Sequence, residues 1–274
     1  MNKIRPICST LFLVLLACGF AAGQIERERG TLVVAVPVNT GLVACADKRL
    51  FNADAGTFTD EFVKIRKASD NALFAATNTI GFYDRKSRKM AFDAFEITQN
   101  YASRHSFTPD KQYWDGLKQE IREKLVTYLS GQPYENWPET DTANKGLLFN
   151  LIFYSVNGDR AYRHTLKVFY EKKKTPVITI PDAVTEEVRF PKLSGKGREV
   201  MRFLAGSPTI ANDPAILRFD ERSFVAASTR TSDAVDFARK LFALTNTEIP
   251  KAQVSSAFDC ALLDHATGFR RLET

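Results

Sequence analysis

Three side chains that together can cleave an amide bond follow one another in the first quarter of the chain. Gly30-Thr31 begins an apolar, β-branched run, Asp47 ends the next apolar run, and Lys64 lies in a third. A threonine hydroxyl becomes a good nucleophile only when a base removes its proton. If the chain is cut before Thr31, the freed α-amine, whose ordinary pKa is about 7.7–8.0, can act as that base.

The other residues of this set have roles that follow from charge and size. A buried Lys64 ammonium beside the amine favours the neutral amine and the developing alkoxide. Asp47 would keep this buried positive charge paired. Gly30 has no side chain, so the Thr31 hydroxyl can approach the Gly30 carbonyl and the chain can cut itself. Taken singly, the same residues are also ordinary: a strand threonine, a turn-capping aspartate and an edge-strand lysine.

Other common catalytic signatures are missing from the sequence. It contains no GxSxG motif, no phosphate-binding loop and no dinucleotide fingerprint. Its histidines, His105, His164 and His265, are far apart, and neither HExxH nor CxxC occurs. We therefore expect an activity that needs no metal and no organic cofactor.

The composition is that of a globular protein. Of the 274 residues, 44% are hydrophobic and 26% are charged. The formal net charge is +6, and residues 1–30, with four basic and two acidic side chains, contribute +2 of it. The basic run Lys172-Lys173-Lys174 is not interleaved with stacking aromatic residues and is typical of a solvated turn. We expect no nucleic-acid partner.

Residues 1–23 have the pattern of a secretory signal peptide. A positively charged start is followed by the apolar run Ile7–Ala22 and by small residues where a signal peptidase could cut. The residues ending at Cys18 resemble a lipobox, so the exported protein could be a lipoprotein before processing. An uncleaved membrane anchor or a buried first helix is the alternative. Residues 24–30 are then a short propeptide, and residues 31–274 form one domain, in the periplasm or outside the cell.

The hydrophobic patterns that must position these residues predict an α+β domain. Strand pairs and helices alternate in blocks, which predicts a four-layer αββα sandwich of two stacked antiparallel sheets. The expected strands are 31–38, 42–46, 62–68, 72–77, 146–156, 160–171, 255–263 and 268–272, and the expected helices are 87–104, 110–129, 194–203 and 232–246.

In their order, Gly30-Thr31, Ala46-Asp47-Lys48-Arg49 and Val63-Lys64-Ile65 resemble the motifs of the proteasome β-subunit family of N-terminal nucleophile hydrolases, which includes simpler bacterial proteasome-like proteases. The 16 positions from Thr31 to Asp47 match the family spacing, and the 17 from Asp47 to Lys64 exceed it by one. The resemblance covers roughly the whole chain after residue 30 in element order, but its specific motifs lie near the start of that region.

The resemblance implies a threonine-type endopeptidase that cuts itself before Thr31 and then hydrolyses peptide bonds with Thr31 as the nucleophile. It implies Ser255 as a supporting hydroxyl and the backbone N–H of Asn78, in place of the family's glycine, as an oxyanion donor. Ala76 would form the floor of a deep apolar substrate pocket, and Phe51 would lie on a substrate-binding strand. The implied partners are a peptide or unfolded protein substrate and further copies of the chain in a homo-oligomeric ring.

Two positions depart from the family pattern and keep other functions open. Lys196 replaces a supporting serine, and Ala252 replaces an aspartate three residues before Ser255. Both changes would weaken the network that orients the amine. The alternatives are an N-terminal nucleophile amidase or acylase that is not a peptidase, and a catalytically inactive proteasome-like subunit. Whether Cys45 and Cys260 pair is also left open.

Overall fold

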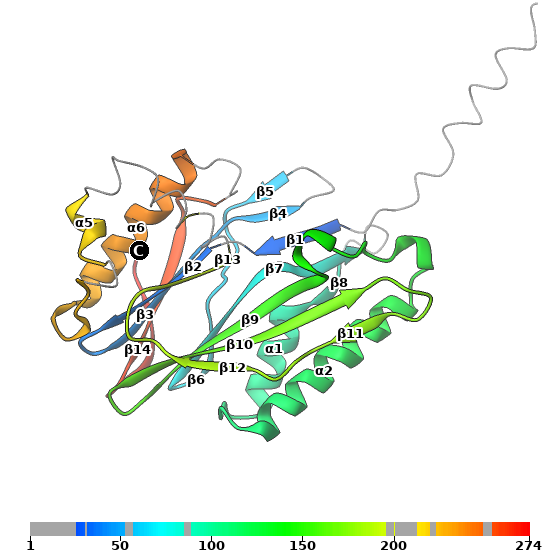
Figure 1. The fold of residues 1–274 in the computed structure, drawn as a ribbon, viewed down its shortest axis with the longest axis horizontal. Helices are drawn as coiled ribbons and strands as arrows, with labels where there is room; N and C mark the ends of the chain where they lie inside the picture. Colours follow the sequence, from blue (N-terminus) through cyan, green and yellow to red (C-terminus); the bar gives the residue numbers. More distant parts are fainter. Residues whose placement is uncertain are drawn as a thin grey trace, which may run out of the picture.

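The computed structural model describes residues 26–30, 32–52, 57–84, 89–195, 200, 213–219, 223–248 and 254–274. The predicted signal peptide lies outside these described residues, and so do Thr31, Lys196 and Ala252. Within them the chain is mixed α/β, with two antiparallel sheets (Figure 1). This agrees with the predicted α+β class.

The larger sheet is built around the long strand β7, which pairs with β9 along one edge and with β1 and β6 along the other. Its order is β11-β10-β9-β7-β1-β4-β5, and β6, β8 and β12 pair beside this path. The strands are β1 (Glu26–Gly30), β4 (Leu50–Asn52), β5 (Thr57–Thr59), β6 (Arg66–Ser69), β7 (Ala72–Asp84), β8 (Lys89–Asp93), β9 (Leu147–Asn157), β10 (Arg160–Glu171), β11 (Val177–Thr179) and β12 (Val184–Glu187).

The smaller sheet has the order β13-β2-β3-β14-β15. Its strands are β2 (Leu32–Val38), β3 (Gly41–Asp47), β13 (Lys192–Gly195), β14 (Phe258–Asp264) and β15 (Gly268–Leu272). The described helices are α1 (Ala94–Arg104), α2 (Lys111–Ser130), α5 (Pro214–Leu217) and α6 (Thr231–Glu248). Short 3-10 turns occupy Tyr134–Asn136, Thr142–Asn144 and Ala226–Ser228.

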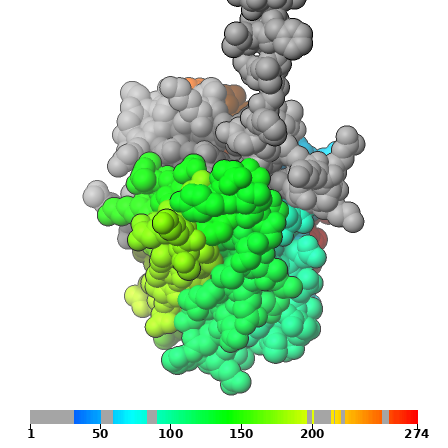
Figure 2. Space-filling view, turned by 90° about the vertical axis from the view of Figure 1, so that its right-hand side faces the viewer, coloured from blue at the N-terminus to red at the C-terminus, as the bar shows by residue number. Residues whose placement is uncertain are grey.

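The buried side chains form three apolar layers. One lies between the larger sheet and helices α1 and α2, and another lies between the smaller sheet and α6. The third fills the space between the two sheets. Figure 1 shows α1 and α2 on one side of the molecule and α6 on the other, and Figure 2 turns the right-hand side of Figure 1 toward the viewer.

Strand β2 shows why its sequence is apolar at every position. Leu32 and Val34 pack toward α6, whereas Val33 and Ala35 face the other sheet. Alternate side chains of a strand point to opposite faces, and here both faces are covered. All seven residues of β2 are buried, as the continuous apolar run predicts.

Several predicted elements differ from the structure. Residues 89–93 form strand β8 instead of the first part of the predicted helix 87–104, and α1 begins only at Ala94, where the Asp93 carboxylate accepts the N–H groups of Phe95 and Glu96 at 2.7 and 3.1 Å. Residues 192–195 form strand β13, so the predicted helix 194–203 does not begin at Ser194. Strand β7 also runs seven residues further than predicted, to Asp84.

A further difference concerns Lys64. The predicted strand 62–68 begins only at Arg66, so Lys64 lies in an irregular segment ahead of β6. This segment turns away from β7 toward the smaller sheet. The N–H of Phe62 donates to the carbonyl of Lys48 at 3.2 Å, and Arg271 of β15 donates to the carbonyl of Ile65 at 3.2 Å. The change of direction brings Lys64 to the end of β3.

Cys45 and Cys260 form a disulfide between β3 and β14. The two residues are direct partners in the ladder, and both are buried. The bond closes a loop with a sequence separation of 215. Such a long loop gives a cross-link a large effect on the entropy of the unfolded chain.

We predict that the variant Cys45→Ala/Cys260→Ala unfolds with a free energy lower by about 3–5 kcal/mol, because the unfolded chain regains the freedom that the disulfide removes. Urea titration of the oxidised protein and the variant measures this. Adding a reductant should lower the urea midpoint of the wild type and leave the variant unchanged. Equal midpoints for the oxidised protein and the variant would contradict the prediction.

His164 of β10 is buried beneath α2. Its ring nitrogens lie 2.9 Å from the Ser155 hydroxyl and 2.8 Å from the Thr185 hydroxyl, and the ring packs against Phe107 and Trp114. Burial lowers the pKa of His164 from 6.5 to about 4. This histidine is therefore a satisfied core residue that stays neutral in the folded protein.

We predict that His164 makes the protein less stable in acid. In the unfolded chain His164 takes up a proton below about pH 6.5, whereas in the folded chain it does so only below about pH 4. The free energy of unfolding therefore decreases as the pH falls from about 6.5 to about 4. Between pH 7 and pH 4.5 the loss due to this residue is about 2–3 kcal/mol. Urea unfolding should show a smaller loss in His164→Gln, whereas the exposed control His105→Gln should lose as much as the wild type.

Candidate functional site

The centre of the candidate site is an ion pair between Lys64 and Asp47. The Lys64 Nζ lies 3.0 Å from the Asp47 Oδ2, and both side chains have 0% exposure. Asp47 is the last residue of β3, and Lys64 is held by the segment that crosses to the smaller sheet. Taking two charges out of water costs several kcal/mol for each ion, so the pairing must offset much of that cost.

Asp47 also binds the backbone on both sides of the pair. Its Oδ1 accepts the N–H of Leu32 at 2.9 Å, and its Oδ2 accepts the N–H of Arg49 at 3.2 Å. The Leu32 nitrogen belongs to the peptide bond that joins it to Thr31. Thr31 itself lies outside the described residues, but the predicted partners Asp47 and Lys64 meet next to the residue that follows it.

The charge state of Lys64 depends on opposing effects. Burial lowers the pKa of Lys64, and the negative charges of Asp47, Asp259 and Asp60 raise it, with Asp47 contributing most. The net direction is downward. The protonation of Lys64 therefore depends on the carboxylates around it, because each of them favours the ammonium form of its side chain.

The predicted oxyanion residue Asn78 lies on the other side of position 31. Strands β1 and β7 pair antiparallel, and Gly30 is directly opposite Asn78. Asn78 has a φ of 72°, in the left-handed region that asparagine tolerates better than most residues. The described neighbours of Thr31 in the chain, Gly30 and Leu32, thus lie beside Asn78 and Asp47 respectively.

Residues 26–30 of the predicted propeptide lie as strand β1 between two other strands. Arg29 is opposite Thr79 of β7 and Phe51 of β4, and Glu28 is opposite Gly81 of β7 and Asn52 of β4. Figure 1 shows β1 between these two strands. Phe51, predicted on a substrate-binding strand, is thus a backbone neighbour of Arg29. Strands β4 and β7 can hold an extended chain from both sides.

Ser255 is buried just ahead of β14, and its hydroxyl accepts the N–H of Ala257 at 3.0 Å. It also interacts with the Asp60 carboxylate, which forms two hydrogen bonds with Arg49, at 2.8 and 2.9 Å. Arg49 and, to a smaller degree, Ser255 hold the pKa of Asp60 below its ordinary value. Through Asp60 the predicted Ser255 belongs to the same group of charges as Lys64.

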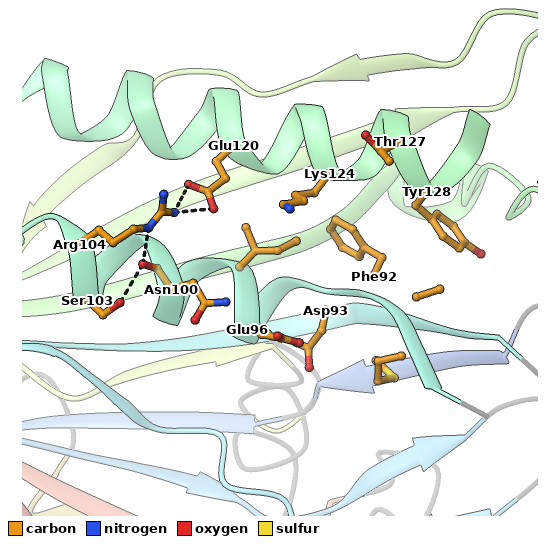
Figure 3. Close-up of a pocket in the computed structure, with 13 residues that line it drawn as sticks. Phe92, Asp93, Glu96, Asn100, Ser103, Arg104, Glu120, Lys124, Thr127 and Tyr128 are labelled. Atoms are coloured by element: carbon orange, nitrogen blue, oxygen red, sulfur yellow. Dashed lines mark hydrogen bonds and ion pairs between the residues drawn. The ribbon is translucent and has the colours of Figure 1, made fainter. Parts of the chain in front are cut away.

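Ala76, predicted at the floor of a substrate pocket, is fully buried in the layer between the larger sheet and helices α1 and α2. A pocket of about 670 Å³ lies elsewhere in this helical layer, between α1, α2 and β8 (Figure 3). Arg104 and Glu120 bridge its two helices through hydrogen bonds of 2.6 and 2.7 Å. Neither Asp47 nor Lys64 lines it.

Sequence reasoning missed three charged residues near the ion pair. Asp60 contacts Arg49, while Asp259 and Arg271 lie beside the segment that carries Lys64. No spacing rule marks them, because Asp60 lies in a loop and the other two meet through the pairing of β14 with β15. The one signal in the sequence is Arg49, the last residue of the Ala46-Asp47-Lys48-Arg49 motif, because an arginine near a buried site usually has a carboxylate partner.

In the part of the chain that the structure describes, no three His, Cys, Asp or Glu side chains gather closely enough to hold a metal ion. None of the helices described is both long and apolar enough to cross a membrane.

Comparison with models of known protein families finds no match. Comparison with curated proteins finds no match either. What the site can do must therefore be inferred from its geometry.

We predict that Lys64→Met destabilises the protein by about 3–5 kcal/mol, because it leaves the Asp47 carboxylate buried without its cation. The double variant Lys64→Met/Asp47→Asn, which removes both charges, should recover much of this loss. Urea unfolding at pH 7 measures all three proteins.

Lys67→Met is the matched control, since Lys67 pairs with Asp70 on the surface. It should leave the urea midpoint unchanged. A urea midpoint of Lys64→Met equal to that of Lys67→Met would contradict the description of Lys64 and Asp47 as a buried pair whose charges depend on each other.

Proposed function

We propose that the protein is a threonine-type endopeptidase of the proteasome-like N-terminal nucleophile class, and that it frees Thr31 by cutting its own chain after Gly30. One observation carries the proposal: the fully buried Lys64–Asp47 pair binds the N–H of Leu32, the residue next to Thr31. The two antiparallel sheets with helices on their outer sides suit the four-layer αββα arrangement of this class.

Self-cleavage would use the residues on both sides of position 31. The Thr31 hydroxyl oxygen adds to the Gly30 carbonyl carbon, the bond from that carbon to the Thr31 nitrogen breaks, and the nitrogen takes up the hydroxyl proton. Asn78, opposite Gly30, would stabilise the negative charge on the carbonyl oxygen through its backbone N–H. Water then hydrolyses the ester, which leaves a carboxylate on Gly30 and a free amine on Thr31.

Peptide hydrolysis would repeat this chemistry on a second chain. The freed amine accepts the Thr31 hydroxyl proton as the oxygen attacks the substrate carbonyl, and it passes the proton to the leaving nitrogen. A Lys64 ammonium beside the amine keeps the amine neutral and stabilises the developing alkoxide. Asp47 holds Lys64 in place at 3.0 Å. Water releases the acyl group, so the reaction needs no metal or organic cofactor.

The strands around β1 favour a peptide as the substrate. If residues 26–30 leave after the cut, β4 and β7 each expose a row of backbone N–H and C=O groups. An extended peptide satisfies both rows, and these backbone contacts do not depend on its sequence. A small acyl compound would leave most of them unpaired. This observation supports an endopeptidase over an acylase that acts on a small molecule.

The disulfide supports the predicted export of the protein. Disulfides persist in oxidising compartments such as the periplasm and the cell exterior and are rare in the cytosol. The Cys45–Cys260 bond is therefore in keeping with a signal peptide at residues 1–23. We also propose, on the resemblance alone, that copies of the chain assemble into a ring around an unfolded or peptide substrate.

N-terminal sequencing and intact mass of the exported protein test the proposal. The wild type should begin at Thr31, and Thr31→Ala should begin upstream, because it lacks the hydroxyl that attacks Gly30. Thr31→Ser is the matched control, since it keeps a hydroxyl and should still begin at position 31. Hydrolysis of fluorogenic peptides should fall by about 10³-fold or more in Thr31→Ala.

Two results would count against the proposal. A wild-type protein that begins at Gln24 and hydrolyses no peptide would favour the inactive subunit. Wild type and Thr31→Ala cut at the same bond would show that another protease removes the propeptide.

A further inference from the structure

Asp259 of β14 is a buried carboxylate that no step above uses. Its side chain is 10% exposed, and neither of its oxygens meets the geometry of a hydrogen bond. Its partner in the ladder is Ala46, the residue before Asp47. Ala46 lies in the apolar layer between the two sheets. An ionised group in such a position is costly unless nearby positive charges offset the loss of water.

The positive charges near Asp259 come from three different parts of the chain. Arg271 of β15 places its Nη1 3.8 Å from the Asp259 Oδ2. Lys48, just after β3, and Lys64, ahead of β6, act on it through their charges, and the backbone N–H of Ile65 also favours its ionised form. Burial raises the pKa of Asp259 to about 6, against the effect of Arg271, Lys48 and Lys64. The carboxylate is therefore mostly ionised at neutral pH.

Arg271 connects this carboxylate to the segment that carries Lys64. Its Nη2 donates to the carbonyl of Ile65 at 3.2 Å while its Nη1 faces Asp259. The backbone at residues 61–65 belongs to no strand ladder, so contacts such as the Phe62–Lys48 backbone hydrogen bond and the Arg271 side chain hold it in place. The same carboxylate acts directly on Lys64 as well, because its negative charge favours the ammonium form.

We propose that Asp259 is a positioning residue for Lys64: it orients Arg271, which holds the Lys64 segment, and it supplies a second negative charge to the Lys64 ammonium beside that of Asp47. This rests on the proposed function in treating Lys64 as part of the hydrolytic site. The proposed peptide site lies between β4 and β7 of the larger sheet, whereas Asp259 belongs to β14 of the smaller sheet. We therefore expect Asp259 to act on Lys64 and not on the bound peptide.

The test compares Asp259→Asn, Asp259→Glu and Arg271→Gln, with the neighbouring exposed Arg270→Gln as the matched control. One readout is the NMR titration of the Lys64 Cε signal in protein labelled with ¹³C-lysine, assigned by its loss in Lys64→Met. The other is the pH profile of fluorogenic peptide hydrolysis by the exported protein.

Asp259→Asn should move the titration midpoint of Lys64 to lower pH, because one stabilising negative charge is gone. We expect kcat at neutral pH to fall about tenfold with KM changed less than twofold, since a poorly placed group costs rate more than binding. The profile should lose any step near pH 6 that reports Asp259. Asp259→Glu should restore the midpoint in large part. Arg271→Gln loosens the Lys64 segment, so it should lower kcat and change the Lys64 Cε signal, whereas Arg270→Gln should change neither.

An unchanged Lys64 midpoint in Asp259→Asn would overturn this inference. A wild type that hydrolyses no peptide would contradict the proposed function, and the Lys64 titration would still decide the role of Asp259. If Asp259→Asn fails to fold, Arg271→Gln decides: a Lys64 Cε signal and a kcat equal to those of Arg270→Gln overturn the inference, and a changed signal with a lower kcat supports it.

Discussion

The structure of the candidate site depends on one buried ion pair at the end of β3. Lys64 and Asp47 are fully buried and 3.0 Å apart. Replacing such a pair with apolar residues of similar volume is often neutral or stabilising, so its presence is weak support for a role in stability. Under the proposed function, the pair instead holds the Lys64 amino group beside the backbone of Leu32, where its positive charge would favour a neutral amine and a developing alkoxide.

The fold places the Lys64–Asp47 pair near the point where the chain leaves the larger sheet and enters the smaller one. β1 belongs to the larger sheet and ends at Gly30, whereas β2 belongs to the smaller sheet and begins at Leu32. The Lys64 segment crosses between the same two sheets. Asp47 and Asn78 therefore come from different sheets, yet both lie next to neighbours of Thr31. The disulfide between β3 and β14 ties together the strand of Asp47 and the strand that follows Ser255.

The sequence alone predicted much of the fold and the two charges at its centre. β2 and β3 are apolar at nearly every position, and helix α2 begins just after the capping residue Asp110, so their patterns are unambiguous. Phe92 is buried in β8. This strand has only five residues, and over so short a stretch the alternation of apolar and polar side chains could not be distinguished from helical spacing. The roles of Asp259 and Arg271 could not be predicted, because they depend on the pairing of β14 with β15 and of β14 with β3.

The most direct measurement is the titration of the Thr31 α-amine in the processed protein, followed by NMR after labelling threonine with ¹⁵N. A fixed Lys64 ammonium should hold the pKa of this amine below the ordinary value of about 7.7–8.0, and Lys64→Met/Asp47→Asn should raise it toward that value. A wild-type amine that titrates in the ordinary range, with no change in the double variant, would contradict the account.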